Sequence, residues 1–192
     1  MSEEVRTRRW TRKEYDRLIE LGLLHEDEPI ELVGGQLVIC EPQHARHATA
    51  IRLANRALRR AFPDDAWEVN VQLPVALDDE SEPEPDLCVV PGAARDYLTA
   101  HPSRPVLAVE ASESTLQLDQ HDKGSLYARA RIADYWIVNL VDEVVEVYRE
   151  PAPAAEARYG WEYRMVQRLG RGASISPLAA PAATIAVADL LP

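Results

Sequence analysis

The sequence predicts an α/β protein in which helices flank a mixed central β-sheet. Two short, continuous apolar runs fit strands buried on both faces, and a long amphipathic pattern before them fits a surface helix. The predicted order of helix, hairpin, helix, strands, helix and strand is neither a regular βαβ repeat nor all-β. With 192 residues, of which 46% are hydrophobic, the chain can bury one sizeable core, so we expect a single domain over residues 1–192.

The N-terminal part predicts a helix and a hairpin. Thr11 and Glu14 have the spacing of a capping box, and the apolar residues that follow end at a glycine, which indicates a short helix. Residues 30–33 and 36–39 are strand-like and surround a Gly-Gly pair, which accepts positive φ without steric cost. These two runs predict a β-hairpin.

A second helix is expected from about residue 44 to residue 62, where apolar residues recur at helical spacing until Pro63. His47 falls on the inward face of this helix. The opposite face carries Arg52, Arg56, Arg59 and Arg60. A DNA-binding stripe is one interpretation of these arginines, but a charged face opposite a core face is typical of any amphipathic surface helix.

The next segments predict the middle of the sheet. Alternation from Trp67 to Val71 indicates a half-buried strand, which we expect to continue through residues 72–75. The acidic, proline-interrupted stretch 78–85 predicts a loop. Residues 87–90 and 106–109 are the two continuous apolar runs, and they predict strands at the centre of the sheet.

The C-terminal half continues the mixed pattern. A helix from about residue 118 to residue 130 leads into a buried strand at 135–138, and a further strand is expected at 144–148. The Pro/Ala-rich stretch 151–157 predicts a mobile hairpin loop before a strand at 161–168.

The net charge of −11 favours solubility and argues against unaided, nonspecific adhesion to nucleic acid, which depends on lysine and arginine displacing counterions. The acidity is uneven, because residues 1–60 hold 11 Lys/Arg against 10 Asp/Glu while the remainder holds 10 against 22. No run of about 18 apolar residues occurs, as a membrane helix would need, so we expect a cytoplasmic protein.

The two cysteines, Cys40 and Cys88, lie beside aliphatic residues and form no CxxC pair, so both are interpreted as small buried apolar groups. Cys40, His44 and His47 could supply three zinc ligands. Structural zinc almost always takes four ligands, and no convincing fourth is near, which disfavours a zinc site.

Two acids stand out at the predicted centre of the sheet. Asp86 opens the strand at 87–90 and Glu110 closes the strand at 106–109, so antiparallel pairing would bring both carboxylates to the same end of the sheet. That arrangement suits a metal site. The connection of about fifteen residues does not force antiparallel pairing, and acids at strand ends are common in any sheet.

Lys123 lies on the same helix face as Leu126 and Tyr127, which points it toward the core. It could serve chemistry there, snorkel to water, or pair with Asp119 one turn earlier. Glu31 and His47 are further candidates that could orient water or touch a phosphate, although a strand glutamate and a core histidine are the simpler interpretations.

Taken together, these segments resemble the Uma-two-type family of "putative restriction endonucleases", within the PD-(D/E)XK nuclease superfamily. The resemblance also includes His47 and covers most of residues 11 to 149. The residues that carry it are Glu31-Leu32-Val33-Gly34-Gly35-Gln36-Leu37, Pro85-Asp86, Val109-Glu110-Ala111-Ser112-Glu113-Ser114-Thr115, Asp119, Lys123, Tyr127 and Asp134-Tyr135-Trp136-Ile137-Val138.

The resemblance implies a restriction-endonuclease-like fold in which Asp86 and Glu110 bind magnesium, with manganese as an alternative and the Ala111 carbonyl as a further candidate ligand. Ser112 occupies the place of the usual catalytic lysine, and Lys123 matches the displaced lysine of this family. Two positions depart from the family pattern, since Arg131-Ile132 replaces Gly-Val and Asn139 replaces an aspartate.

The leading hypothesis is therefore metal-dependent hydrolysis of phosphodiester bonds in DNA. A hard divalent cation prefers oxygen ligands, and Lys123 could stabilise the charge that grows on phosphate. The alternatives are a catalytically silent domain that binds nucleic acid, or a protein-interaction module using exposed residues such as Trp161 and Tyr163. A homodimer is expected, because duplex DNA has two strands and the chain has one candidate centre.

Overall fold

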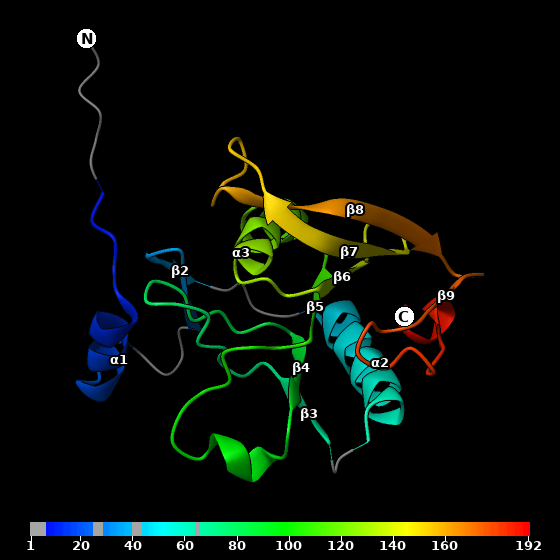
Figure 1. Cartoon of the computed structure of the whole chain (residues 1–192), viewed down its shortest axis with the longest axis horizontal. Coiled ribbons are helices and arrows are strands. Elements are labelled where there is room, and N and C mark those ends of the chain that lie inside the picture. The colour runs from blue at the N-terminus through cyan, green and yellow to red at the C-terminus, as the bar shows by residue number, and fades with distance from the viewer. Residues whose placement is uncertain (1–6, 25–28, 40–43, 64–65) are drawn as a thin grey trace.

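A six-stranded mixed β-sheet forms the centre of the computed structural model, which describes residues 7–24, 29–39, 44–63 and 66–192. The strands stand side by side in chain order, and only β5 and β6 run parallel (Figure 1). Their bounds are β3 Trp67–Val71, β4 Leu87–Pro91, β5 Leu107–Ser112, β6 Asp134–Asn139, β7 Val144–Pro153 and β8 Trp161–Gly170. The predicted α/β class with a mixed sheet is confirmed.

Helices cover both faces of this sheet. Because side chains alternate between the faces of a strand, Val109 and Trp136 pack in the same core as α2 (Ala45–Ala61), whereas Ala108 and Tyr135 pack with Tyr127 on the other face. Two consecutive segments cover that second face: η2 (Leu118–Lys123), which is a π-helix, and α3 (Gly124–Arg129). No helix in the described ranges is long and apolar enough to cross a membrane.

The N-terminal helix and hairpin form as the sequence predicts. α1 (Arg12–Glu20) begins at a complete capping box, in which Thr11 and Glu14 bond to each other's backbone N–H groups at 3.3 and 2.9 Å. The hairpin of β1 (Ile30–Val33) and β2 (Gln36–Ile39) is a separate two-stranded sheet. Its two turn glycines both adopt positive φ, as expected.

The C-terminal segment, for which the sequence suggested no elements, completes the core on the α2 face. β9 (Ser174–Ile175) pairs with β10 (Ile185–Ala186), and a short 3-10 turn, η3 (Val187–Asp189), follows. Figure 1 shows this red segment beside α2. Apolar side chains from it, including Ile175, join the cluster of α2 and the sheet. A second 3-10 turn, η1 (Ala94–Tyr97), follows β4.

Two predicted strand boundaries are wrong. β3 ends at Val71 and does not continue, because Gln72 adopts φ 51° and turns the chain so that its backbone N–H reaches the Asp86 carbonyl at 3.2 Å. β5 runs past Val109 to Ser112, because its parallel neighbour β6 supplies partners along that whole stretch. Glu110 therefore lies inside a strand and does not close one.

The loop expected at 151–157 forms only from Ala154, and the chain then turns until β8 begins at Trp161. β7 includes Pro151 and Pro153, which pair with residues of β8 on one side. On its other side, β7 pairs with β6 only as far as Arg149, so no strand lies where the missing N–H groups of the two prolines would donate.

The exposure predicted for Tyr163 is wrong. Tyr163 is buried, and its hydroxyl donates to the Ile132 carbonyl at 2.8 Å. It is therefore no exposed docking residue.

Candidate active site

Asp86 and Glu110 come together at one end of the sheet. β4 and β5 are antiparallel with Leu87 opposite Val109, so Asp86 stands next to Glu110. The Asp86 backbone N–H donates to Glu110 Oε2 at 3.1 Å, and the Ala111 N–H donates to Asp86 Oδ2 at 2.8 Å. The strands therefore pair antiparallel, which the sequence had left open. Each of the two carboxylates accepts a backbone N–H group from the strand that carries the other.

Lys123 reaches the same place from η2. Its ammonium lies 3.1 Å from Glu110 Oε1 and 3.3 Å from Glu31 Oε2, and the residue is only 6% exposed. The alternative that the Lys123 ammonium extends into solvent is therefore wrong. Glu31 comes from the β1–β2 hairpin, so three separate elements converge on one buried ion-pair network.

Tyr127 is a member of this network to which sequence reasoning assigned no role. Its hydroxyl donates to Glu110 Oε1 at 2.7 Å, so one carboxylate oxygen receives both the tyrosine and the lysine. The available signal was the four-residue spacing of Lys123 and Tyr127, which places two polar ends on one face of a helix.

His47 and Gln72 contact the other carboxylate. His47 Nε2 lies 3.1 Å from Asp86 Oδ2 and 3.2 Å from Oδ1, and the Gln72 amide donates to Oδ1 at 3.2 Å. The hydrogen bond to Asp86 raises the pKa of His47, and partial burial opposes the rise. The inward orientation predicted for His47 is confirmed. The side chain of Gln72 contacts Asp86 because the backbone turns at this residue.

Asp119 and Ser112 line the continuation of the site along η2 and β5. Asp119 is buried and accepts a hydrogen bond from the Thr115 hydroxyl at 2.7 Å. Ser112 is also buried, and its hydroxyl lies 3.4 Å from that of Thr115. Because side chains alternate along a strand, Ser112 shares its sheet face with Glu110, and this part of the site carries hydroxyl groups and an acid.

Four buried carboxylates, from Glu31, Asp86, Glu110 and Asp119, act electrostatically on the buried ammonium of Lys123. Burial raises the pKa of Glu110 to about 8, with Lys123 acting in the opposite direction and the other acids adding to the rise. Burial likewise raises the pKa of Asp119. Burial lowers the pKa of Lys123, but Glu110 and Glu31 outweigh it and hold this pKa well above the ordinary value.

The donor set suits a hard divalent cation. Carboxylate oxygens are the ligands that magnesium prefers, and the buried acids outnumber the buried cations, so a metal ion would offset their repulsion. Within the described ranges, no three His, Cys, Asp or Glu side chains form a ready-made cage. Magnesium commonly keeps several waters and takes only one or two protein carboxylates, which Asp86 and Glu110 can supply.

The cysteine expectations are partly tested. Cys88 is buried on β4 as predicted, and burial raises the pKa of its thiol to about 12. Cys40 lies outside the described residues, so the disfavoured zinc site with His44 and His47 stays a sequence-level alternative.

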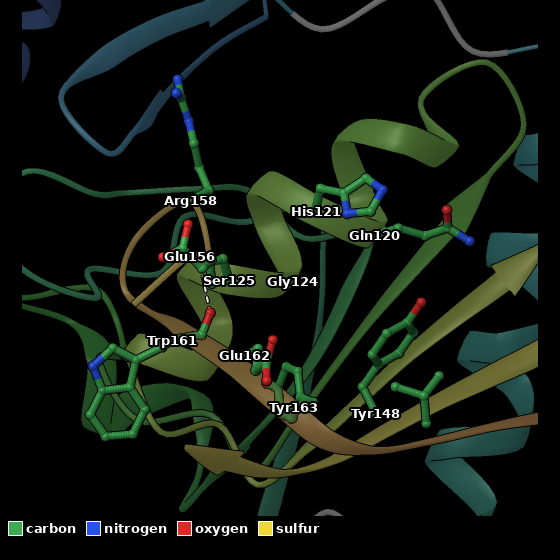
Figure 2. A pocket seen from close by; sticks show the side chains of 12 residues that line it. Gln120, His121, Gly124, Ser125, Tyr148, Glu156, Arg158, Trp161, Glu162 and Tyr163 are labelled. Atoms are coloured by element: carbon green, nitrogen blue, oxygen red, sulfur yellow. Dashed lines mark hydrogen bonds between the residues drawn. The ribbon is translucent and has the colours of Figure 1, made fainter. Parts of the chain in front are cut away.

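A pocket of about 640 Å³ borders the same helical segment, but none of the Glu110 network lines it. In Figure 2, Gln120 and His121 leave η2 above the strands that carry Tyr148, Glu162 and Tyr163. The Ser125 hydroxyl donates to the Trp161 carbonyl at 2.6 Å and closes one wall. η2 therefore separates this pocket from the buried carboxylates.

The six-stranded mixed sheet and the helices on its two faces define an α/β fold with a cluster of buried carboxylates at one end of the sheet. The structure is similar to the "Crystal structure of a putative nuclease belonging to DUF820 from Anabaena variabilis ATCC 29413", with a TM-score of 0.68 and 14% identity over 89% of this chain and 94% of that one. The chain belongs to the Uma2 family, described as "Putative restriction endonuclease", whose model matches residues 12–188. No curated protein matches it.

Proposed function

We propose that this protein is a metal-dependent endonuclease that hydrolyses phosphodiester bonds in DNA. The observation that carries the proposal is the convergence on Glu110, where the Asp86 backbone, Lys123 and Tyr127 all bond to one buried carboxylate. Membership of a restriction endonuclease family supports the same reaction class. Two adjacent acids can hold a metal ion that activates water, and a lysine beside them can stabilise the negative charge that develops on phosphate.

Each side chain has a distinct task in this proposal. Asp86, Glu110 and the Ala111 carbonyl would hold Mg²⁺ or Mn²⁺, which would supply a Lewis acid and an activated water. Lys123 carries a fixed positive charge and can donate to a phosphate oxygen as negative charge develops there. Tyr127 holds Glu110 in place, and His47 holds Asp86. Glu31 keeps Lys123 charged and oriented.

A second candidate is a catalytically silent domain that uses the same fold to bind nucleic acid or a protein. One observation favours it: the oxygens of Asp86 and Glu110 already accept hydrogen bonds from the protein itself. The net charge of −11 gives little attraction for phosphate, so within this alternative it favours a protein partner over nucleic acid. A metal ion would have to displace some of these internal donors.

The deciding experiment is a cleavage assay on supercoiled plasmid and linear DNA with Mg²⁺ or Mn²⁺, alongside calorimetric titration of Mn²⁺. We expect the wild-type protein to cleave and Asp86→Ala to lose at least about 100-fold in rate. Asp189→Ala removes an exposed acid near Arg60 and is the matched control that keeps activity. Equal cleavage by wild type and Asp86→Ala would mean that another site acts, and no cleavage with no Mn²⁺ binding would favour the silent domain.

A further inference from the structure

The helix that delivers Lys123 contains an unusual turn. The Gly124 N–H donates to the Asp119 carbonyl five residues earlier, and shares this contact with the His121 carbonyl. One turn before, Asp119 N–H donates to Thr115 in the ordinary four-residue pattern, at 3.0 Å. The segment between Asp119 and Gly124 therefore holds one more residue than an α-helical turn would, and such insertions are rare and are concentrated at functional sites.

The extra residue changes which side chains share a face. In an unbroken α-helix, the eight residues from Asp119 to Tyr127 would place these two side chains about 80° apart around the axis. One inserted residue takes back about 100°, which leaves them within about 20° of each other. Consistent with this, Asp119, Lys123 and Tyr127 are all buried against the sheet. The π turn therefore places Asp119, Lys123 and Tyr127 on one face of the helical segment, the face from which Lys123 and Tyr127 contact Glu110.

Tyr135 holds this turn from the sheet. It lies on β6, is fully buried, and its hydroxyl donates to the Asp119 carbonyl at 3.0 Å, the same oxygen that accepts the π bond from Gly124. The contact is close, since a β-carbon on Gly124 would stand 3.3 Å from that carbonyl oxygen and 3.8 Å from the Tyr135 ring.

A second contact fixes the outer side of the turn. The Gln120 amide donates to both oxygens of Glu146, at 2.9 and 3.1 Å, and Glu146 on β7 is itself buried. The Tyr148 hydroxyl also donates to Glu146, at 2.6 Å, and Gln120 and Tyr148 point toward one another in Figure 2. The turn is thus held at its carbonyl by β6 and at its side chain by β7.

We propose that Tyr135 is a positioning residue, which holds the π turn of η2 and thereby keeps Lys123 against Glu110. Its catalytic consequence rests on the proposed nuclease function, whereas its structural part does not. Without the hydroxyl, the segment relaxes toward an α-helical register, in which Gly124 N–H would donate to Gln120, and the alignment of Lys123 with Glu110 is lost.

The test compares Tyr135→Phe with Tyr163→Phe. Both substitutions remove a buried hydroxyl that donates to a backbone carbonyl, at 3.0 Å from Asp119 and 2.8 Å from Ile132, and the two rings stack in one cluster with centroids 6.0 Å apart. Their effects on thermal stability should therefore be similar. Crystal structures of both variants and steady-state cleavage kinetics give independent readouts of the position of Lys123 and of its consequence.

In Tyr135→Phe, we expect the distance from Lys123 Nζ to Glu110 Oε1 to exceed about 4 Å, which is the upper limit for an ion pair. We also expect kcat to fall by about 10-fold or more, while KM stays within about twofold of the wild-type value. Tyr163→Phe should keep both the 3.1 Å contact and kcat. An unchanged Lys123–Glu110 contact in Tyr135→Phe, or equal kcat in the two variants, would overturn the inference. If the wild-type protein does not cleave DNA, the proposed nuclease function fails and the measured distance alone decides the role of Tyr135.

Discussion

Lys123 is a buried cation balanced by the carboxylates of Glu110 and Glu31. Lys123→Met would leave these acids without a buried positive charge, so we expect a loss of about 3 kcal/mol in the free energy of unfolding, far above the cost of losing a surface ion pair. If Lys123 stabilises the transition state, cleavage should also fall by about 100-fold. Urea unfolding and the plasmid assay measure the two effects separately.

Lys13 on α1 is the other lysine of the chain and provides the control. It is exposed, so Lys13→Met should change neither stability nor cleavage. A folded Lys123→Met variant that cleaves at the wild-type rate would remove this residue from the mechanism. Lysine is rare in this chain: the 21 basic residues include only two lysines, and one of them is buried among acids. Arginine at nearly every other basic position makes Lys123 a residue that the sequence alone could single out.

At the scale of elements, the β1–β2 hairpin matters because it carries Glu31 to the site. Its turn abuts the loop between β7 and β8: Gly34 has φ 54°, and a β-carbon there would overlap the ring of Tyr159. Gly34→Ala should therefore destabilise the protein by about 2–3 kcal/mol, from backbone strain and overpacking together. Displacing the hairpin should also weaken the contact between Glu31 and Lys123, and so lower cleavage.

Gly160 separates the two causes. It has φ 74°, but a β-carbon there would meet nothing within 4 Å. Gly160→Ala should cost only the backbone strain, about 1 kcal/mol, and leave cleavage unchanged. Thermal unfolding of both variants gives the comparison, and equal losses would show that the Tyr159 contact does not hold the hairpin.

At the scale of the whole molecule, we predict that the protein forms a twofold dimer on DNA. A duplex presents two scissile strands, whereas each chain offers one Glu110 centre. Sedimentation velocity at micromolar concentration, with and without DNA, measures the assembly, and a Glu110→Gln variant keeps the DNA intact during the run. A monomer under both conditions would contradict the prediction.

Local patterns in the sequence were sufficient for most elements and for the identity of the central acids. The capping box at Thr11, the glycine pair of the hairpin and the apolar runs of β4 and β5 each depend on neighbouring residues, so their structure follows from short stretches of chain. Antiparallel pairing of β4 and β5 then brings Asp86 beside Glu110, although Glu110 lies inside β5 and not at the strand end that the pattern suggested.

Contacts between distant segments decided the rest. Gln72 and Tyr127 joined the site, Tyr163 became buried, and the π turn of η2 replaced a regular helix, because partners more than ten residues away fixed each one. No local pattern encodes a hydrogen bond from Tyr135 to Asp119 or an ion pair from Glu31 to Lys123. These depend on how the hairpin, η2 and the sheet pack, since only tertiary packing sets which polar groups share a buried space.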